Sequence, residues 1–280
     1  MSPLSLGFSP CPNDTLIFYA LVHNKIDLGT LDFAAPVLRD VEQLNSWAQQ
    51  KKLDVTKLSF HALGHVLDEY CVLSAGSALG KGCGPLLIAR PGISADDLRG
   101  KKIAIPGKLT TAALLFRMFM PECEHLVQMR FDHIMEAIKS GEVDAGVIIH
   151  ESRFTYEQQG FVALQDLGEW WETKTEMPIP LGCIAARRSL GSEKIRLIDQ
   201  AIKESVTRGL ANPVDCMPYI QQNSQELAPD VVQEHIKLYV NDFSKKLGAE
   251  GRAAIETFLE LGRKAGVLPE NNKSLMVNGL

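Results

Sequence analysis

Strand-like and helix-like stretches alternate along almost the whole chain. Leu4 to Phe8 and Val55 to Phe60 are short, apolar runs typical of buried strands. Between them, Asn13 or Asp14 is expected to cap a helix that ends near His23, and Asp40 to cap a second that ends near Gln50. Farther along, isoleucines at 195, 198 and 202 have the spacing of a buried helix face. This alternation predicts an α/β protein with largely parallel sheets.

A weak internal repeat suggests two similar lobes. KLDVTKLSF (52–60) aligns with EVDAGVIIH (142–150), and each segment follows a predicted helix and has an Asp where a predicted strand begins. We interpret the apolar segments 84–94 and 181–191 as crossings between the lobes. We therefore expect one lobe of residues 1–90 plus 187–280 and a second lobe of 91–186. Two such lobes would form a clamshell with a ligand cleft between them.

Charge and hydropathy limit the kinds of partner. The 280 residues carry a net charge of −5 without a long run of one sign, so neither a nucleic-acid footprint nor a basic membrane-binding face is expected. No apolar stretch approaches the ~20 residues that span a bilayer, and the residues MSPLSLGFSPCPND lack the pattern of a signal peptide. We expect a cytoplasmic protein whose partner is a small molecule. The oligomeric state is left open.

Cysteine and histidine patterns give little indication of a metal. The six cysteines, at 11, 71, 83, 123, 183 and 216, include no C-x-x-C pair, so no zinc site or redox dithiol is expected. His61, His65 and Glu69 are four residues apart, but their order is not H-E-x-x-H, and we expect a partly exposed helix face. Cys11 has no basic neighbour in the sequence, which favours a packing or cleft-lining thiol over a nucleophile.

His150 is the leading candidate for catalysis. It directly follows a predicted strand, and in open α/β sheets the carboxyl ends of the strands face the ligand crevice. A neutral imidazole there can accept a proton near pH 7, although a structural histidine is an equal alternative for such a residue taken alone. Glu151 is expected to point to the opposite side of the extended chain, and a surface or helix-capping role is at least as well supported for it.

Further candidates for substrate binding lie at other strand ends. Lys57, Leu58 and Ser59 occupy the position that mirrors the His150 strand. IPGKLTTAALLF (105–116) is a strand end, a loop and a helix start, where the hydroxyls of Thr110 and Thr111 and free N–H groups suit a carboxylate. A simple threonine cap is the alternative. The candidate set also includes Asn13, Ala112 and Ser74, the last in the glycine-rich segment 74–85.

Several of these stretches together resemble one family. They are LGFSPCPNDTLIFYALVHNKID, DVTKLSF, GKGCGPLLIA, IPGKLTTAALL, GEVDAGVIIHESRFTY and LGEWWE, and in this order they closely resemble the 1,4-dihydroxy-6-naphthoate synthases of the futalosine route to menaquinone. The resemblance covers essentially the whole chain. It implies a type 2 periplasmic-binding-protein-like clamshell that works as a cytosolic lyase without a metal or organic cofactor.

The resemblance also implies a reaction and a set of site residues. Cyclic dehypoxanthine futalosine would be converted to 1,4-dihydroxy-6-naphthoate and a three-carbon fragment from the ribose. His150 would be the proton acceptor. The residues that would line the substrate site are Lys57, Leu58, Ser59, Thr111 and Ala112.

Two alternatives remain. A non-catalytic solute-binding protein of the same fold would use a histidine in the cleft only to hydrogen-bond its ligand, and the missing signal-peptide pattern argues against it. The sister enzyme that dehydrates chorismate shares the fold, and the stretches PCPNDT and HESRFTY favour the naphthoate synthase over it.

Overall fold

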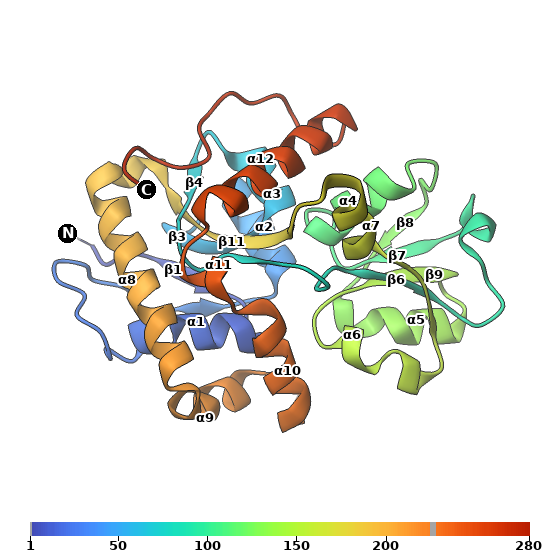
Figure 1. Ribbon diagram of the computed structural model, residues 1–280, viewed down its shortest axis with the longest axis horizontal. Helices are drawn as coiled ribbons and strands as arrows, with labels where there is room; N and C mark the ends of the chain where they lie inside the picture. Colours follow the sequence, from blue (N-terminus) through green and yellow to red (C-terminus); the bar gives the residue numbers. More distant parts are fainter. Residues whose placement is uncertain (1, 225–227) are drawn as a thin grey trace.

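Two β-sheets, one in each half of the molecule, organise the fold (Figure 1). The computed structural model describes residues 2–224 and 228–280. The first sheet has the strand order β2-β1-β3-β11-β4, and β5 also pairs with β11. Its strands are β1 (Leu6–Phe8), β2 (Val37–Leu38), β3 (Val55–Ser59), β4 (Tyr70–Val72), β5 (Ala78–Gly80) and β11 (Ile179–Arg187).

The second sheet has the strand order β10-β6-β9-β7-β8. Its strands are β6 (Leu86–Ala89), β7 (Ile103–Ile105), β8 (Leu126–Gln128), β9 (Ala145–Ile148) and β10 (Val162–Asp166). In each sheet three neighbouring strands are parallel, β2-β1-β3 and β9-β7-β8. The other pairings are antiparallel, because β6 and β11 enter their sheets from the opposite half of the molecule. The sheets are therefore mixed rather than largely parallel.

The chain crosses between the two halves twice. Sheet membership changes between β5 and β6 and again between β10 and β11, and the division into lobes at residues 91 and 187 stays a prediction. At the first crossing Gly84 lies against the start of α7 (Leu167–Thr175). A Cβ atom on Gly84 would lie 2.3 Å from the Cα of Gly168, so this close approach requires glycine.

Helices cover both faces of the first sheet (Figure 1). One face packs under α1 (Pro12–Val22) and α8 (Ser192–Ala211), with α9 (Pro213–Asn223) and α10 (Pro229–Tyr239) against α1. The other face packs under α2 (Val41–Gln49), α3 (Phe60–Val66) and α12 (Gly248–Lys264). The latter core continues into the second half through α4 (Thr111–Phe119) and α7, where Trp171 contacts Phe258 with ring centroids 5.4 Å apart.

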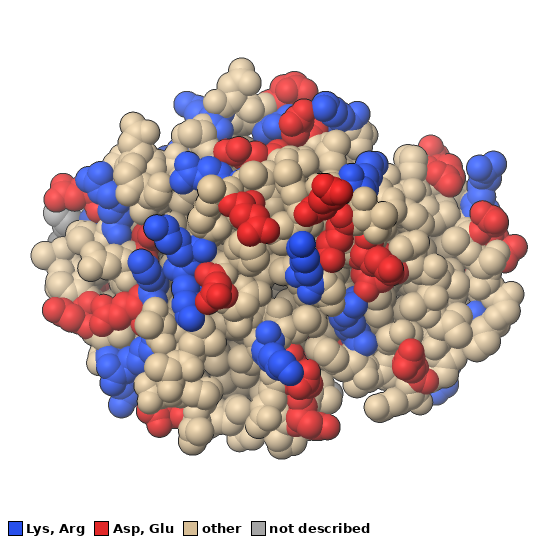
Figure 2. Space-filling view, in the orientation of Figure 1, with Lys and Arg blue, Asp and Glu red and all other residues tan. Residues whose placement is uncertain are grey.

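The remaining helices of the described chain have seven residues or fewer. The second sheet packs against α5 (Ile134–Ser140), whose apolar side chains join a separate small core. The others are α6 (Ser152–Thr155), α11 (Asp242–Lys245) and the 3-10 helices η1 (Ala95–Leu98), η2 (Phe131–His133), η3 (Glu157–Gln159) and η4 (Arg188–Leu190). Among the described helices, none has both the length and the apolar character to cross a membrane. Acidic and basic side chains are interspersed on the face shown in Figure 2.

Of the two helix caps predicted from the sequence, one is correct and one is wrong. Asp40 caps α2 as expected, and its carboxylate accepts a hydrogen bond of 2.9 Å from the backbone of Glu42. Helix α1 instead begins at Pro12 with Cys11 as its cap, so the prediction that Asn13 or Asp14 caps it is wrong. Both side chains lie in the first turn and have partners elsewhere. The expected loop 74–85 contains the strand β5.

Candidate active site

A cavity between the two halves contains almost all of the predicted site residues. It encloses about 620 Å³ of space between the atoms, with the open solvent at its mouth included. The predicted residues that line it are Asn13, Lys57, Leu58, Ser59, Thr110, Thr111, Ala112 and His150. Ser74 is not among the lining residues, and its hydroxyl donates to Asp199 of α8 at 2.6 Å. Ser74 therefore joins the segment after β4 to α8, and nothing in the geometry supports a substrate contact for it.

His150 lies just after strand β9 of the second sheet and has a strained backbone. It lies between β9 and α6 with a φ of 57°, a left-handed conformation that is uncommon for residues other than glycine. Its ring lies 4.9 Å from the Phe131 ring and 6.1 Å from the His235 ring, the latter nearly parallel at 8°. Within residues 2–224 and 228–280, no side chain or backbone group hydrogen-bonds the His150 ring. Ring contacts thus hold the imidazole while its nitrogens stay available to a ligand.

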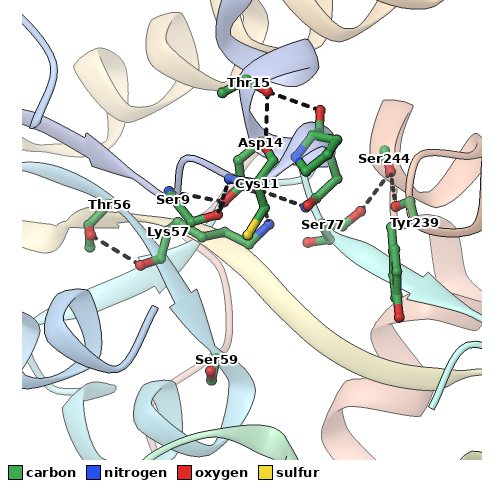
Figure 3. A network of polar contacts seen from close by, with 12 residues as sticks. Ser9, Cys11, Asp14, Thr15, Thr56, Lys57, Ser59, Ser77, Tyr239 and Ser244 are labelled. Atoms are coloured by element: carbon green, nitrogen blue, oxygen red, sulfur yellow. Dashed lines mark hydrogen bonds and ion pairs between the residues drawn. The ribbon is translucent and has the colours of Figure 1, made fainter. Parts of the chain in front are cut away.

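Lys57 contributes a buried cation that already has a partner. It lies in β3 with 5% of its surface exposed, and its Nζ is 2.5 Å from Oδ1 of Asp14 in α1. The Asp14 carboxylate also accepts hydrogen bonds from the hydroxyl of Ser9 (2.7 Å) and the amide of Asn13 (2.8 Å). Figure 3 shows Lys57, Asp14, Ser9 and Cys11 grouped around the start of α1. The charge of Lys57 is therefore largely balanced before any ligand binds.

The same network reaches a histidine that the sequence analysis did not single out. Because the Asn13 amide nitrogen donates to Asp14, its Oδ1 is an acceptor, and Nε2 of His235 lies 2.9 Å from it. His235 must therefore donate through Nε2. The ring is fully buried in α10, and burial holds its pKa well below the usual value, so it is neutral. The other nitrogen, Nδ1, is thus an acceptor.

The start of α4 presents backbone donors rather than hydroxyls. The Thr110 hydroxyl accepts from the N–H of Ala113 and donates to the carbonyl of Gly107. The Thr111 hydroxyl donates to the carbonyl of Leu181 at 2.6 Å and accepts from the N–H of Phe60 at 3.2 Å. The described residues provide no acceptor for the N–H groups of Thr111 and Ala112. These two N–H groups are the free donors that a carboxylate would meet there.

Helix α2 supplies two buried residues that sequence reasoning missed. The Asn45 carbonyl accepts from the N–H of Ser59 at 2.9 Å, and its amide donates to the hydroxyl of Ser59 and the carbonyl of Leu109. Among the described residues none accepts the hydroxyl proton of Ser59, which remains free to donate. Glu42 accepts from the N–H of Leu109, and burial raises the pKa of its carboxyl. Asn45 connects β3 to the loop before α4, and Glu42 connects α2 to the same loop; neither relation has a local sequence signal.

Burial also determines the roles of Cys11 and His61. Burial raises the pKa of the Cys11 thiol well above its usual value, with Glu151 adding to the effect, so the thiol is neutral, as expected for a residue that is not a nucleophile. His61 is buried rather than partly exposed, its Nδ1 donates to the carbonyl of Thr110 at 3.0 Å, and burial lowers its pKa to about 4. No group of three or more possible metal ligands was found among the described residues.

The family model for menaquinone biosynthesis matches residues 4–264. The chain belongs to this family. A 1,4-dihydroxy-6-naphthoate synthase of Thermus thermophilus is 44% identical to it over 281 residues, covering 99% of this chain and 100% of its relative. A second synthase of that name, from Streptomyces coelicolor, is 42% identical over 276 residues and 95% of each chain. The resemblance drawn from the sequence motifs is confirmed.

Solved structures place this family member among the periplasmic-binding-protein folds. The crystal structure of an Archaeoglobus fulgidus protein matches with a TM-score of 0.89 and 34% identity, covering 95% of this chain and 98% of its own. An alkanesulfonate-binding protein of Xanthomonas axonopodis matches with a TM-score of 0.69 and 13% identity over 96% and 95% of the two chains. The predicted two-lobed α/β fold is confirmed, because these neighbours and the two sheets agree.

Proposed function

We propose that this protein is a cytoplasmic carbon–carbon lyase of menaquinone biosynthesis that converts cyclic dehypoxanthine futalosine to 1,4-dihydroxy-6-naphthoate. The observation that carries the proposal is the 44% identity to a synthase of that name over essentially the full length of both chains. The cavity supports it, since it is lined by a histidine whose ring nitrogens have no hydrogen-bond partner among the described residues. Its substrate is a small molecule.

His150 is the proposed general base. Its ring removes a proton from the bound substrate, which allows the carbon–carbon bonds to the sugar-derived ring to break in a retro-aldol-like elimination. Formation of the aromatic bicycle supplies the driving force. General-base catalysis contributes typically about 10²- to 10⁴-fold, so positioning of the substrate in the cavity must contribute as well. The free hydroxyl proton of Ser59 is suited to stabilise an enolate oxygen.

The walls of the cavity suit a flat acid. Leu58, Ile149 and Leu181 offer apolar contacts to the bicycle. The N–H groups of Thr111 and Ala112, at the start of the nine-residue helix α4, would bind its carboxylate. The hydroxyl of Thr111 already donates to the carbonyl of Leu181, so we assign the carboxylate of the ligand to the backbone N–H groups.

The test is to incubate the purified protein with cyclic dehypoxanthine futalosine and follow the naphthoate product. We expect turnover by the unaltered protein and its loss in His150→Ala, whereas His125→Ala, at an exposed histidine, should retain it. Tight binding without turnover would instead favour a solute-binding protein, and consumption of chorismate would favour the sister enzyme. Full activity of His150→Ala would refute the role given to His150.

A further inference from the structure

A second cavity lies beside the first and has its own lining. It encloses about 650 Å³ including its mouth, and its lining includes Cys11, Arg39, Asp40, Arg130, Phe131 and Glu151. The linings of the two cavities contact each other around His150. That residue lines the first cavity, its chain neighbour Glu151 lines the second, and the Phe131 ring of the second cavity is 4.9 Å from the His150 ring. A ligand that fills both cavities would therefore pass the proposed base at their junction.

The second cavity differs from the first in its chemistry. Its lining carries two guanidinium groups and two carboxylates, whereas the first cavity has mainly apolar walls. Arg130 pairs with Asp132 at 2.7 Å, Arg39 donates to the carbonyl of Leu38, and Asp40 accepts from the backbone of Glu42, so these three groups already have partners within the protein. Such a lining suits an uncharged polar group better than an ion.

Glu151 provides an acceptor without a donor. It is 7% exposed rather than on the surface, and its buried Oε2 has no hydrogen-bond partner among the described residues. Nδ1 of His235 lies 4.0 Å from Oε1 of Glu151, and this nitrogen is also buried without a hydrogen-bond partner among the described residues. A buried acceptor left without a donor costs about 1–3 kcal/mol, so this arrangement favours a donor brought by a ligand.

The protein cannot supply that donor through His235. Asp14 only accepts, so Asn13 turns its amide nitrogen toward it and its oxygen toward His235. His235 then donates through Nε2 and presents the lone pair of Nδ1 to Glu151. Because this ring is neutral, the 4.0 Å contact is not an ion pair but a meeting of two acceptors.

We propose that the second cavity binds an uncharged, hydroxyl-bearing part of the substrate, and that the Glu151 carboxylate accepts hydrogen bonds from its hydroxyl groups. This inference rests on the proposed function, in which the substrate joins a flat acid to a sugar-derived ring. The flat acid occupies the first cavity and the sugar-derived ring the second. The bonds that break then lie beside His150.

The product tests this assignment because it lacks the sugar hydroxyls. In Glu151→Gln we expect KM for the substrate to rise about tenfold, the usual effect of losing hydrogen bonds to a charged group, while the inhibition constant of added 1,4-dihydroxy-6-naphthoate changes by less than about twofold. The fold should be kept, since the new amide can donate to Nδ1 of His235. Glu142→Gln, at an exposed glutamate, should change neither constant.

A second variant acts by shape rather than charge. Cys11→Met would fill part of the second cavity, and it should also raise KM while sparing product inhibition. Equal losses for substrate and product in these variants, or an unchanged KM in Glu151→Gln, would overturn the subsite. Absence of turnover by the unaltered protein would instead refute the proposed function.

Discussion

The left-handed backbone of His150 leads to a prediction about stability that is independent of the reaction. His150→Gly and His150→Ala both remove the imidazole and its contacts with Phe131 and His235. The difference between the two variants therefore reports on the backbone alone. At a φ of 57° a residue with a Cβ atom is strained by about 1–2 kcal/mol, and glycine is not.

The opposing effect is the greater freedom of glycine in the unfolded chain. It favours alanine by about 0.5–1 kcal/mol, so the glycine variant should be the more stable of the two by about 0.5–1 kcal/mol. The matched control is Lys203, an exposed residue inside α8. There Lys203→Gly should be less stable than Lys203→Ala by about 1 kcal/mol, because an ordinary helical backbone favours alanine. The order of the two variants thus reverses between the two positions.

Urea unfolding of the four variants measures these differences, provided that all show the same dependence on denaturant. Both His150 variants are expected to lose naphthoate formation. A His150→Ala variant as stable as His150→Gly, with the expected order at Lys203, would show that His150 is not strained in solution, and the link between its backbone and its position in the cavity would fail.

Three further predictions follow from buried groups. Lys57→Met should lower the free energy of unfolding by about 3–5 kcal/mol, because Asp14 stays buried without its cation, and adding Asp14→Asn should restore part of it in urea unfolding. For His61 the folded pKa is about 4 and the unfolded value about 6.5, so the unfolded chain binds the proton first and stability falls as pH drops from about 6.5 to 4. The pKa shift of His61 contributes up to about 3 kcal/mol to the free energy of unfolding. His61→Gln should therefore flatten the plot of stability against pH over that range. Some dependence on pH should remain, because the pKa of His235 is also lowered. Gly84→Ala should cost about 1–3 kcal/mol in thermal unfolding because its Cβ would meet Gly168.

Features determined by near neighbours in the chain were predictable from the sequence. The apolar run before His150 became β9, Asp40 became the cap of α2, and the isoleucines at 195, 198 and 202 became the buried face of α8. The positions of Lys57, Ser59 and Thr111 in one cavity followed from the rule that strand ends face a cleft. Helix α1 was predicted with the wrong cap, because Pro12 takes the first helical position and Asp14 has a stronger partner in Lys57.

Features that depend on distant contacts had no local signal. His235 is 222 residues from Asn13, its hydrogen-bond partner, and a lone histidine on an amphipathic helix looks like any other. Asn45 and Glu42 act on the loop before α4 through contacts that only the folded chain creates. Ser74 was placed in the site because a glycine-rich segment suits a ligand, yet its hydroxyl is held by Asp199 of a distant helix.

The direction of the hydrogen bonds connects the two cavities chemically. The Asp14 carboxylate, which pairs with Lys57, can only accept hydrogen bonds. Asn13 must therefore donate to Asp14 through its amide nitrogen, and His235 must donate through Nε2 to the amide oxygen of Asn13. The series ends at a lone pair that faces Glu151. The lysine in β3 therefore begins the series that keeps His235 from donating to Glu151, so this carboxylate stays an acceptor for donors that a ligand brings. Loss of Lys57 should weaken the discrimination between substrate and product, even in variants whose fold survives.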